Sequence, residues 1–361
     1  MTRIYLVRHA EAEGNIYRRA HGHFNGQIIG RGYLQIEQLR KRFADEKPDA
    51  VYSSDLARAC TTAIPVCESH GLTLNVTGQL REVCMGSWED EAWGDLEYSD
   101  PEMSGYFSND PARWRVSGGE TYDRVRERMM DCISGIARRH DGETVMAFSH
   151  GFAIRTFLCG VLGVKSEDVA KVPYCDNTAV ALLTYDKGTP AIEYQGDNTH
   201  LSSEISTFAH QTWWRAQDEW VSENLRYAKY DEARDFELSE SAKREKILSS
   251  GCDEKITAYL ANEPVGAIGL DTSAGLIKYI FVRPEYRRKN YGVQLLGHAM
   301  SFFRKLGSDT LRVDTAGNTD APVFLRKYGF ESTGTGEKAC LFERSLSAKA
   351  ENAYPKRSVI I

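Results

Sequence analysis

The amino-acid sequence predicts two α/β units in one chain, the first an α/β sandwich with a mostly parallel sheet and the second a smaller mixed α/β domain. Apolar strand-like runs alternate with helix-like patterns from residue 2 to about 200, and the alternation restarts near Asn224. Such alternation is typical of sheets covered by helices. The length of 361 residues also exceeds that of one ordinary domain.

The expected strands of the first unit are short β-branched or apolar runs at residues 4–7, 51–52, 72–76, 144–148, 178–185 and 192–195. Helical patterns separate them at residues 33–43, 56–70, 121–139 and 152–161. In the third of these helices, apolar residues recur at steps of three and four and predict one buried stripe: Val125, Met129, Ile133 and Ile136. Ligand sites in such sheets gather at the carboxyl ends of the strands.

The expected boundaries follow these patterns: a first domain at 1–202, a packed aromatic connector at 203–223, a second domain at 224–346 and a loosely held tail at 347–361. The connector carries three tryptophans, whereas a flexible linker is poor in aromatic residues. In the second domain we expect strands at 255–261, 265–271, 276–282 and 311–316, a helix at 294–306 and a short helix that ends near 327–330.

Composition excludes several classes of protein. The net charge of −6, without a compensating Lys/Arg cluster, argues against a nucleic-acid-binding surface. The eight cysteines are scattered without a CxxC pair, a pattern that suits reduced thiols in the cytosol. The apolar run at the N-terminus is too short for a signal peptide, and no run approaches the ~18 apolar residues of a membrane span. We therefore expect a cytoplasmic protein without nucleic-acid or membrane partners, and leave its oligomeric state open.

Polar motifs follow one another in order along the first unit: RHAEAEGN (8–15), GHFNGQIIGRGYLQ (22–35), YSSDLARACTTA (52–63), LREVCMGSWED (80–90), GGE (118–120) and FSHG (148–151). In kind, order and spacing this set resembles the histidine phosphatase superfamily over about residues 2–202. The resemblance implies a three-layer α/β sandwich and phosphoryl transfer from a small phosphorylated metabolite through a phosphohistidine.

The residue types suit this chemistry. Phosphoryl transfer to an imidazole requires a neutral nitrogen aimed at phosphorus and cationic donors around the phosphate oxygens. His9 is the expected nucleophile. Arg8, Arg58 and His150 are expected to hold the phosphate, because a guanidinium fork matches two oxygens at once. Asn15 is expected to add a neutral hydrogen bond. The resemblance assigns the same positions to the nucleophile and the phosphate pocket.

The leaving alkoxide requires a proton, and Glu82 is the expected general acid, provided that burial keeps its carboxyl group protonated near neutral pH. We expect no metal, because three cationic groups already neutralise the phosphate. His21 and His23 could suggest a metal pair, but two ligands do not make a site, and a polar loop at the rim of the pocket is the preferred interpretation.

Two further features have simpler interpretations. Glu11 and Glu13 are expected to be solvated or helix-start carboxylates. Residues 91–117, rich in aromatic residues and turn formers, form either a substrate lid or a covering loop, and we prefer the lid.

In the second unit, the stretch YIFVRPEYRRKNYGVQLL (279–296) runs from a strand through a basic turn into a helix. Backbone N–H groups at such a helix start can bind a pyrophosphate. The stretch resembles motif A of GNAT-type N-acetyltransferases, (Q/R)xxGx(G/A), and the resemblance extends over about 224–345. It implies acetyl-CoA as cosubstrate and an amine acceptor. The expected cofactor-binding residues are Phe281, Val282, Arg287, Arg288, Lys289, Asn290, Gly292, Asn318 and Tyr328.

Two positions depart from the pattern of that family. Asn290 replaces the first glycine of the motif; asparagine tolerates a positive φ, but its side chain could crowd the pyrophosphate. Leu325 stands where many members have a tyrosine that protonates the departing CoA thiolate. Tyr328 could substitute only if the helix extends that far.

These observations predict a bifunctional enzyme, a metal-independent phosphomonoester hydrolase joined to an acetyl-CoA-dependent N-acetyltransferase. Three alternatives remain: a phosphatase with a non-catalytic, CoA-binding regulatory domain, a phosphotransferase of the phosphoglycerate mutase type, and a non-enzymatic scaffold. The intact set of His9, Arg58, Glu82 and His150 argues against the scaffold.

Overall fold

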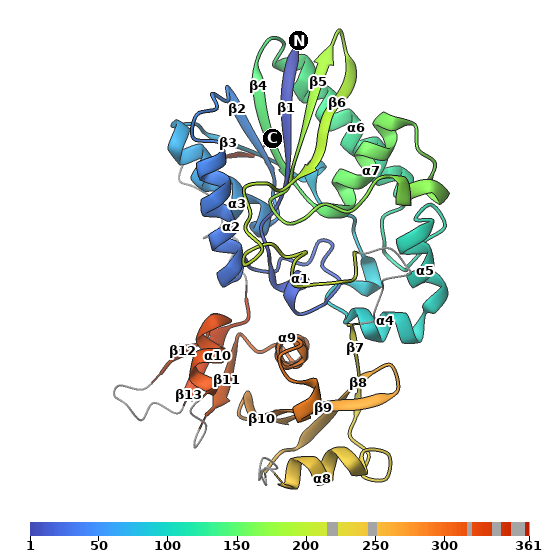
Figure 1. Ribbon diagram of the computed structural model, residues 1–361, viewed down its shortest axis with the longest axis vertical. Coiled ribbons are helices and arrows are strands. Elements are labelled where there is room, and N and C mark those ends of the chain that lie inside the picture. Colours follow the sequence, from blue (N-terminus) through green and yellow to red (C-terminus); the bar gives the residue numbers. More distant parts are fainter. Residues whose placement is uncertain (215–222, 245–250, 316–319, 334–340, 348–357, 361) are drawn as a thin grey trace.

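The chain forms two α/β domains, each built on one sheet (Figure 1). The structure, a computed structural model, describes residues 1–361 except 215–222, 245–250, 316–319, 334–340, 348–357 and 361. Within the described residues each sheet has seven strands. The prediction of two α/β units is confirmed.

The front sheet is mostly parallel, as predicted. Its order is β14-β3-β2-β4-β1-β5-β6. The strands from β14 to β1 pair in parallel, whereas β5 and β6 are antiparallel. The strands are β1 (Thr2–Arg8), β2 (Ala50–Ser54), β3 (Leu74–Thr77), β4 (Thr144–Ser149), β5 (Val180–Asp186), β6 (Thr189–Asp197) and β14 (Ser358–Ile360).

Helices cover both faces of the front sheet, because successive side chains of a strand point to opposite sides. In β1, Ile4 and Leu6 join the apolar core under α6 and α7, whereas Tyr5 and Val7 join the core under α2 and α3. The result is a three-layer sandwich. Its helices are α1 (Glu13–Ile16), α2 (Gly30–Arg42), α3 (Ala57–His70), α4 (Trp93–Ser99), α5 (Pro101–Asn109), α6 (Tyr122–Arg139) and α7 (Gly151–Leu162), with 3-10 turns η1 (Gly78–Leu80), η2 (Gly86–Trp88) and η3 (Ser166–Lys171).

Local patterns in the front domain agree with the packing. The apolar stripe predicted for α6 is buried along its length. Residues 91–117 contain α4 and α5. Most of their aromatic side chains pack on the apolar core, although Tyr98 is exposed. Phe107 stacks on Phe152 of α7 with ring centroids 5.0 Å apart, and Trp114 is 1% exposed. This packing favours a fixed cover over the lid that we preferred from the sequence.

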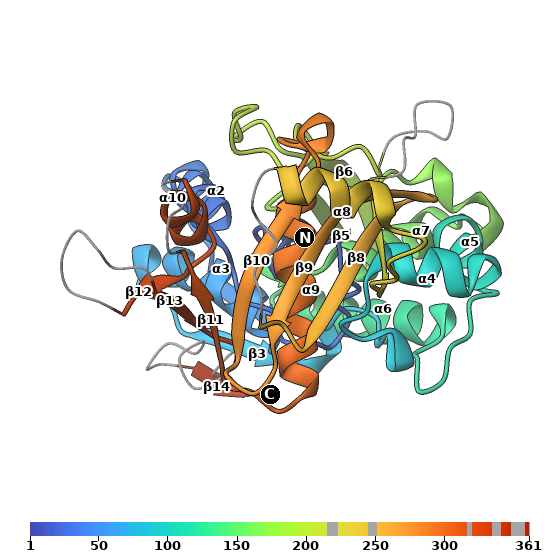
Figure 2. The same cartoon turned by 90° about the horizontal axis from the view of Figure 1, so that it is seen from below.

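The rear sheet has the order β12-β13-β11-β10-β9-β8-β7. Figure 2 looks onto this sheet, with α8 across its outer face and α9 behind it, toward the front domain. Its strands are β7 (Leu225–Lys229), β8 (Glu254–Leu260), β9 (Glu263–Asp271), β10 (Leu276–Val282), β11 (Thr310–Asp314), β12 (Glu331–Ser332) and β13 (Leu341–Ser345). Its helices are α8 (Phe236–Arg244), α9 (Tyr291–Lys305) and α10 (Ala321–Lys327), with the 3-10 turn η5 (Pro284–Tyr286).

The two domains share an apolar core. Ile16, Tyr17 and Ile29 of the front domain belong to the same buried cluster as the inner face of α9. Glu11 and Glu13 lie close to this contact and are both fully buried, so the expectation that they are solvated is wrong. Glu13 does begin α1, but it is ion-paired rather than exposed to water.

The connector and the tail also contact the front domain. In the described part of the connector, the Trp213 ring lies 5.0 Å from the Tyr174 ring, and the Arg18 guanidinium stacks over Trp213. At the end of the chain β14 pairs with β3, a strand that we did not predict in a loosely held tail.

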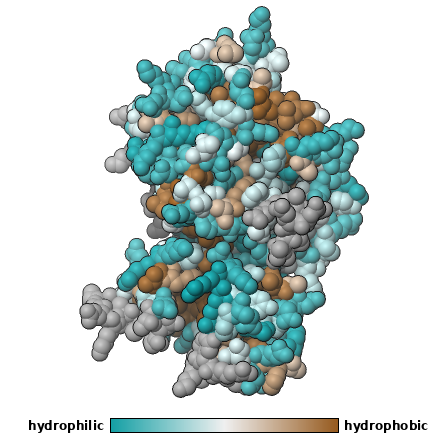
Figure 3. All heavy atoms as spheres, viewed as in Figure 1, coloured by the Kyte–Doolittle hydropathy of each residue, from teal (hydrophilic) through white to brown (hydrophobic). Residues whose placement is uncertain are grey.

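Hydrophilic side chains cover most of the face seen in Figure 3, with small apolar patches between them. Among the described residues, no helix combines the length and the apolar character needed to cross a bilayer.

Candidate active sites

Two of the predicted site residues follow neighbouring parallel strands at the carboxyl edge of the front sheet. Arg8 at the end of β1 is paired in register with Ser149 at the end of β4. The next residues are His9 and His150, and the His9 N–H donates to the Ser149 carbonyl at 2.9 Å. Their ring centroids lie 5.1 Å apart. The sheet register therefore brings the two histidines together.

His9 has the geometry of a nucleophile. Its Nδ1 lies 2.7 Å from the Ala10 carbonyl oxygen, an acceptor, which places the ring proton on Nδ1 and leaves the Nε2 lone pair free. Burial, with the nearby Arg58 and Arg8 guanidinium groups, holds the pKa of His9 well below its ordinary value. The ring is therefore neutral at physiological pH, as attack on phosphorus requires.

Arg8 and Arg58 supply the positive charge. Arg58 is 1% exposed and donates to the carbonyls of Phe24 at 2.8 Å and Gly22 at 2.7 Å. Arg8 donates through Nη1 to the Cys175 carbonyl at 2.6 Å. Among the described residues the Nε atoms of both arginines have no hydrogen-bond partner. Because an unpaired buried donor is costly, these atoms fit an anionic ligand.

His150 adds a polar group but not the expected positive charge. It is fully buried, and neither ring nitrogen has a partner among the described residues. Burial and the Arg58 guanidinium hold the pKa of His150 well below its ordinary value. The ring is therefore a neutral N–H donor, which corrects our expectation of three cationic groups around the phosphate. Of the predicted phosphate-binding residues, Arg8 and Arg58 supply the positive charge.

Asn15 lies at the same pocket together with a residue that sequence reasoning missed. The Asn15 side-chain oxygen accepts the N–H of Ala12 at 3.0 Å and the Asn177 amide at 3.4 Å. Asn177 is fully buried and also donates to the His9 carbonyl at 2.9 Å. Within the described chain its Oδ1 has no partner. A cluster of turn formers, CDNT at 175–178, immediately precedes β5 and was the available signal.

Glu82 lies at the helix start that follows His150. Its carboxylate oxygens accept the backbone N–H groups of Phe152 at 3.1 Å and Ala153 at 2.9 Å, in the first turn of α7. His150 is the N-cap residue of the same helix. These bonds fix the carboxyl group of Glu82 at the start of α7.

His21 and His23 do not form a metal pair. The His23 Nε2 lies 2.9 Å from the Glu82 carbonyl, and the His21 Nε2 lies 3.2 Å from Asp90. Among the described residues, no group of three or more His, Cys, Asp and Glu side chains could hold a metal ion. The two histidines belong to a polar loop beside the pocket.

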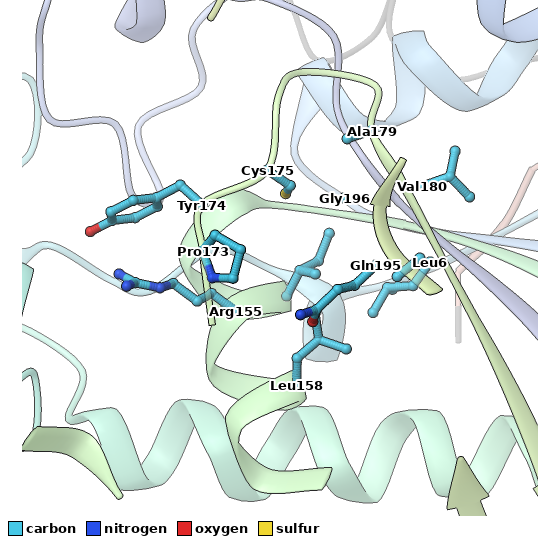
Figure 4. A pocket seen from close by; sticks show the side chains of 12 residues that line it. Leu6, Arg155, Leu158, Pro173, Tyr174, Cys175, Ala179, Val180, Gln195 and Gly196 are labelled. Carbon is cyan, nitrogen blue, oxygen red and sulfur yellow. The ribbon is translucent and has the colours of Figure 1, made fainter. Parts of the chain in front are cut away.

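A small cavity lies between α7 and the front sheet (Figure 4). Its volume is about 20 Å³, and its lining includes Cys175, Gln195 and Arg155, whose guanidinium stacks on Tyr174. Such a volume holds one water molecule, not a metabolite. This cavity is therefore too small to be the substrate site.

In the rear domain, the basic turn leads into α9 as predicted. Asn290 is the N-cap residue of α9 and has a φ of 65°, and Arg288 has a φ of 62°. The asparagine therefore tolerates the left-handed conformation that a glycine would adopt there. Arg287, Arg288 and Lys289 are exposed beside the N–H groups of the helix start. This arrangement suits a pyrophosphate.

Strand β10 is open along part of one edge. It pairs in parallel with β11 only at Leu276 and Ile277, whereas its pairing with β9 continues to Val282. Among the described strands, none pairs with the β11-facing edge of β10 at Phe281 or Val282. The Val282 carbonyl is bonded instead to the Arg287 Nε of the basic turn at 2.9 Å. An extended ligand that bound here as an added strand would replace this bond.

The remaining predicted cofactor residues contribute less. Asn318 lies outside the described residues. Leu325 is buried in the core. Tyr328 could replace the missing tyrosine only if the helix extended to it, but α10 ends at Lys327. The Tyr328 ring packs on Tyr17 of the front domain at a centroid distance of 6.5 Å. The structure therefore places Tyr328 between the domains rather than beside the open edge of β10.

Comparison with known proteins agrees with the division of the chain into a front and a rear domain. The family model described as histidine phosphatase superfamily (branch 1) matches residues 4–198, and the acetyltransferase (GNAT) domain matches residues 253–332. Phosphoserine phosphatase 1 of Hydrogenobacter thermophilus is 28% identical over 213 residues, which cover 58% of this chain and 99% of that protein. The metal-independent phosphoserine phosphatase of Arabidopsis thaliana is 33% identical over 206 residues, covering 56% of this chain and 84% of that protein.

A solved structure has the same front fold. YhfR of Bacillus stearothermophilus superposes with a TM-score of 0.54 at 28% identity and covers 55% of this chain and 99% of its own. The six ordered motifs of the front unit and the neutral histidine at the sheet edge agree with these matches. The chain is an enzyme that belongs to the histidine phosphatase superfamily and carries a GNAT acetyltransferase domain behind its phosphatase domain.

Proposed function

We propose that the front domain is a metal-independent phosphomonoester hydrolase that acts through a phosphohistidine at His9. One observation carries this proposal: a neutral histidine with a free Nε2 lies beside two buried guanidinium groups whose Nε atoms have no partner among the described residues. A phosphate group would supply the missing acceptors.

The reaction has two balanced steps. In the first, the His9 Nε2 lone pair forms a bond to phosphorus while the bond to the leaving oxygen breaks, and Glu82 gives its proton to that oxygen. In the second, Glu82 takes a proton from water, the water oxygen attacks phosphorus, and the P–N bond breaks. Arg8 and Arg58 stabilise the charge on the phosphoryl oxygens in both steps.

The substrate is a small phosphorylated metabolite, and phosphoserine is the first ester to test. Two relatives are named phosphoserine phosphatases, one of them metal-independent. The alternative is a phosphotransferase of the phosphoglycerate mutase type, which would move the phosphate within its substrate rather than release it. The two differ in the yield of inorganic phosphate.

For the rear domain we propose acetyl-CoA binding at the turn 287–292 and the open edge of β10. Transfer of the acetyl group to an amine is the bifunctional form of this proposal. The position of Tyr328 between the domains favours the alternative of a CoA-binding domain without transfer, because Leu325 supplies no acid for the CoA thiolate.

We also propose a cytoplasmic location, without nucleic-acid or membrane partners. The seven cysteines in the described part of the chain are all free, as in a reducing compartment. The net charge of −6 does not suit a nucleic-acid surface.

The test begins with a panel of phosphorylated metabolites, phosphoserine among them, assayed for inorganic phosphate with and without EDTA. A radiolabelled ester quenched in alkali should leave label on the wild-type chain, because phosphohistidine survives alkali, and none on His9→Ala. The best product is then offered with acetyl-CoA, and release of free CoA is measured. Labelling that persists in His9→Ala would overturn the proposed nucleophile.

A further inference from the structure

A buried ion cluster joins the rear domain to the loop behind the catalytic histidine. Glu13 in α1 is fully buried, and its Oε2 accepts a hydrogen bond of 2.9 Å from Arg304 of α9. Its Oε1 accepts a second from Arg344 of β13. Arg344 also donates to the Tyr17 hydroxyl and the Tyr328 carbonyl, each at 2.7 Å. One front-domain carboxylate is therefore held by two rear-domain guanidinium groups.

This cluster is two residues from the phosphate pocket. Asn15 belongs to the same helical turn as Glu13, and its side-chain oxygen caps that turn through the Ala12 N–H. The Asn15 amide also contacts Asn177, which is bonded to the His9 carbonyl. A shift of Glu13 would therefore move Asn15 relative to His9.

A second series of contacts leads from α9 to Arg58. The Arg304 guanidinium lies 5.1 Å from the centre of the Phe24 ring. The carbonyl of Phe24 accepts the Arg58 Nη1 at 2.8 Å. Arg304 also lies 3.8 Å from Asp90, the carboxylate to which His21 is bonded. The loop that orients Arg58 is therefore packed against α9.

The approach of α9 to α1 depends on a glycine. A Cβ added to Gly297 in α9 would lie 2.3 Å from the Tyr17 Cβ and 2.4 Å from its Cγ. The Tyr17 Cβ is fixed by the backbone, so no side-chain rotation can relieve this contact. The two helices are thus in contact without space for one methyl group.

We propose that the acetyltransferase-like domain is part of the phosphatase machinery, with Arg304 and Arg344 as positioning residues for Asn15 and Arg58. The inference rests on the proposed phosphatase function. Removal of one guanidinium leaves Glu13 with half of its buried partners, a situation that destabilises the local arrangement. The phosphate pocket then loses its geometry although neither arginine touches the substrate.

The experiment uses the full-length chain and two readouts. Hydrolysis of phosphoserine, or of the best ester of the panel, gives kcat and KM, and calorimetry gives the affinity for inorganic phosphate. Arg344→Met should raise the Kd for phosphate and the KM together by ~10- to 100-fold, as misplacement of a binding group does. Arg344→Lys, which restores one charge next to Glu13, should recover part of this loss.

Two controls are matched to these variants. Arg312→Met replaces an exposed arginine on the neighbouring strand β11, 3.7 Å from Glu343, and should leave both readouts unchanged. Gly297→Ala should reproduce the loss seen in Arg344→Met, whereas Gly135→Ala in α6, where the nearest atom is 3.9 Å away, should not. Gly297→Ala also serves as the test should Arg344→Met not fold.

The outcomes separate the two proposals. A wild-type chain that hydrolyses no ester removes the proposed function, but its affinity for inorganic phosphate still tests the inference. Wild-type phosphate affinity and KM in both folded Arg344→Met and folded Gly297→Ala would overturn the positioning role.

Discussion

The rings of His9 and His150 lie side by side at a centroid distance of 5.1 Å and are tilted to each other by 55°. They follow adjacent parallel strands, so the sheet register determines their separation. The pKa values of both rings lie well below the ordinary histidine value, chiefly because both are buried and lie beside Arg58. The site therefore combines two neutral histidine rings with the buried guanidinium groups of Arg8 and Arg58.

We predict that His9→Ala lowers the hydrolysis of p-nitrophenyl phosphate or of the natural ester by at least ~10³-fold, because the covalent intermediate cannot form. The exposed His210 provides a control, since His210→Ala should keep full activity. EDTA should leave the wild-type rate unchanged, because Arg8 and Arg58 neutralise the phosphate. Near-normal hydrolysis by His9→Ala, or loss of the wild-type rate in EDTA, would show that the mechanism is wrong.

Glu82→Gln should slow the hydrolysis of alkyl phosphates by ~10²–10⁴-fold and that of p-nitrophenyl phosphate much less, since nitrophenolate leaves without a proton. The ratio of the two rates is the measurement. A purely structural disturbance at the start of α7, where Glu82 binds Phe152 and Ala153, would slow both substrates equally. Equal loss would therefore remove Glu82 from the acid role.

The front site was largely predictable because its residues follow elements with clear patterns. His9 and His150 come directly after apolar strand-like runs, and the carboxyl ends of parallel strands meet at one edge. Asn177 was not predictable. It lies in a turn without periodicity, and its contact with the His9 carbonyl spans 168 positions of the chain. The neutral state of His150 also required the structure, because it depends on burial.

In the rear domain, backbone conformation was easier to predict than domain docking. The positive φ of Asn290 follows from a local motif and a known property of asparagine. By contrast, Glu13 and Arg344 are 331 positions apart, and no local pattern indicates that they meet. Tyr328 lies against Tyr17 for the same reason: the docking of two domains decides its surroundings.

We predict a pH-dependent loss of stability from His298, which stacks on Tyr227 between the domains. Burial, helped by Arg19 and Lys305, holds the pKa of His298 well below its ordinary value. Below pH ~6.5 the unfolded chain binds a proton that the folded chain does not, so this residue lowers the free energy of unfolding as pH falls, by up to ~1.4 kcal/mol per pH unit.

His298→Phe should keep the stacked ring and reduce this slope. Urea denaturation at pH 7 and pH 5.5 measures the change in the free energy of unfolding with pH. Replacement of the exposed His210 by phenylalanine provides the control. If the free energy of unfolding fell by the same amount between pH 7 and pH 5.5 in wild type and His298→Phe, His298 would not be the source of the pH dependence.

The last prediction concerns the turn before α9 and acetyl-CoA. Calorimetry on the full-length chain, whose domains share one core, should detect acetyl-CoA binding, and salt should weaken it by screening the exposed charges of Arg287, Arg288 and Lys289. Asn290→Gly should tighten binding or leave it unchanged, because glycine adopts a φ of 65° freely and removes a side chain from the approach of the pyrophosphate. Asn290→Ala should cost ~1 kcal/mol in the strained turn and weaken binding. Weaker binding by Asn290→Gly would mean that the asparagine side chain itself contacts the ligand, and an absence of heat at millimolar acetyl-CoA would remove the acyl-CoA assignment.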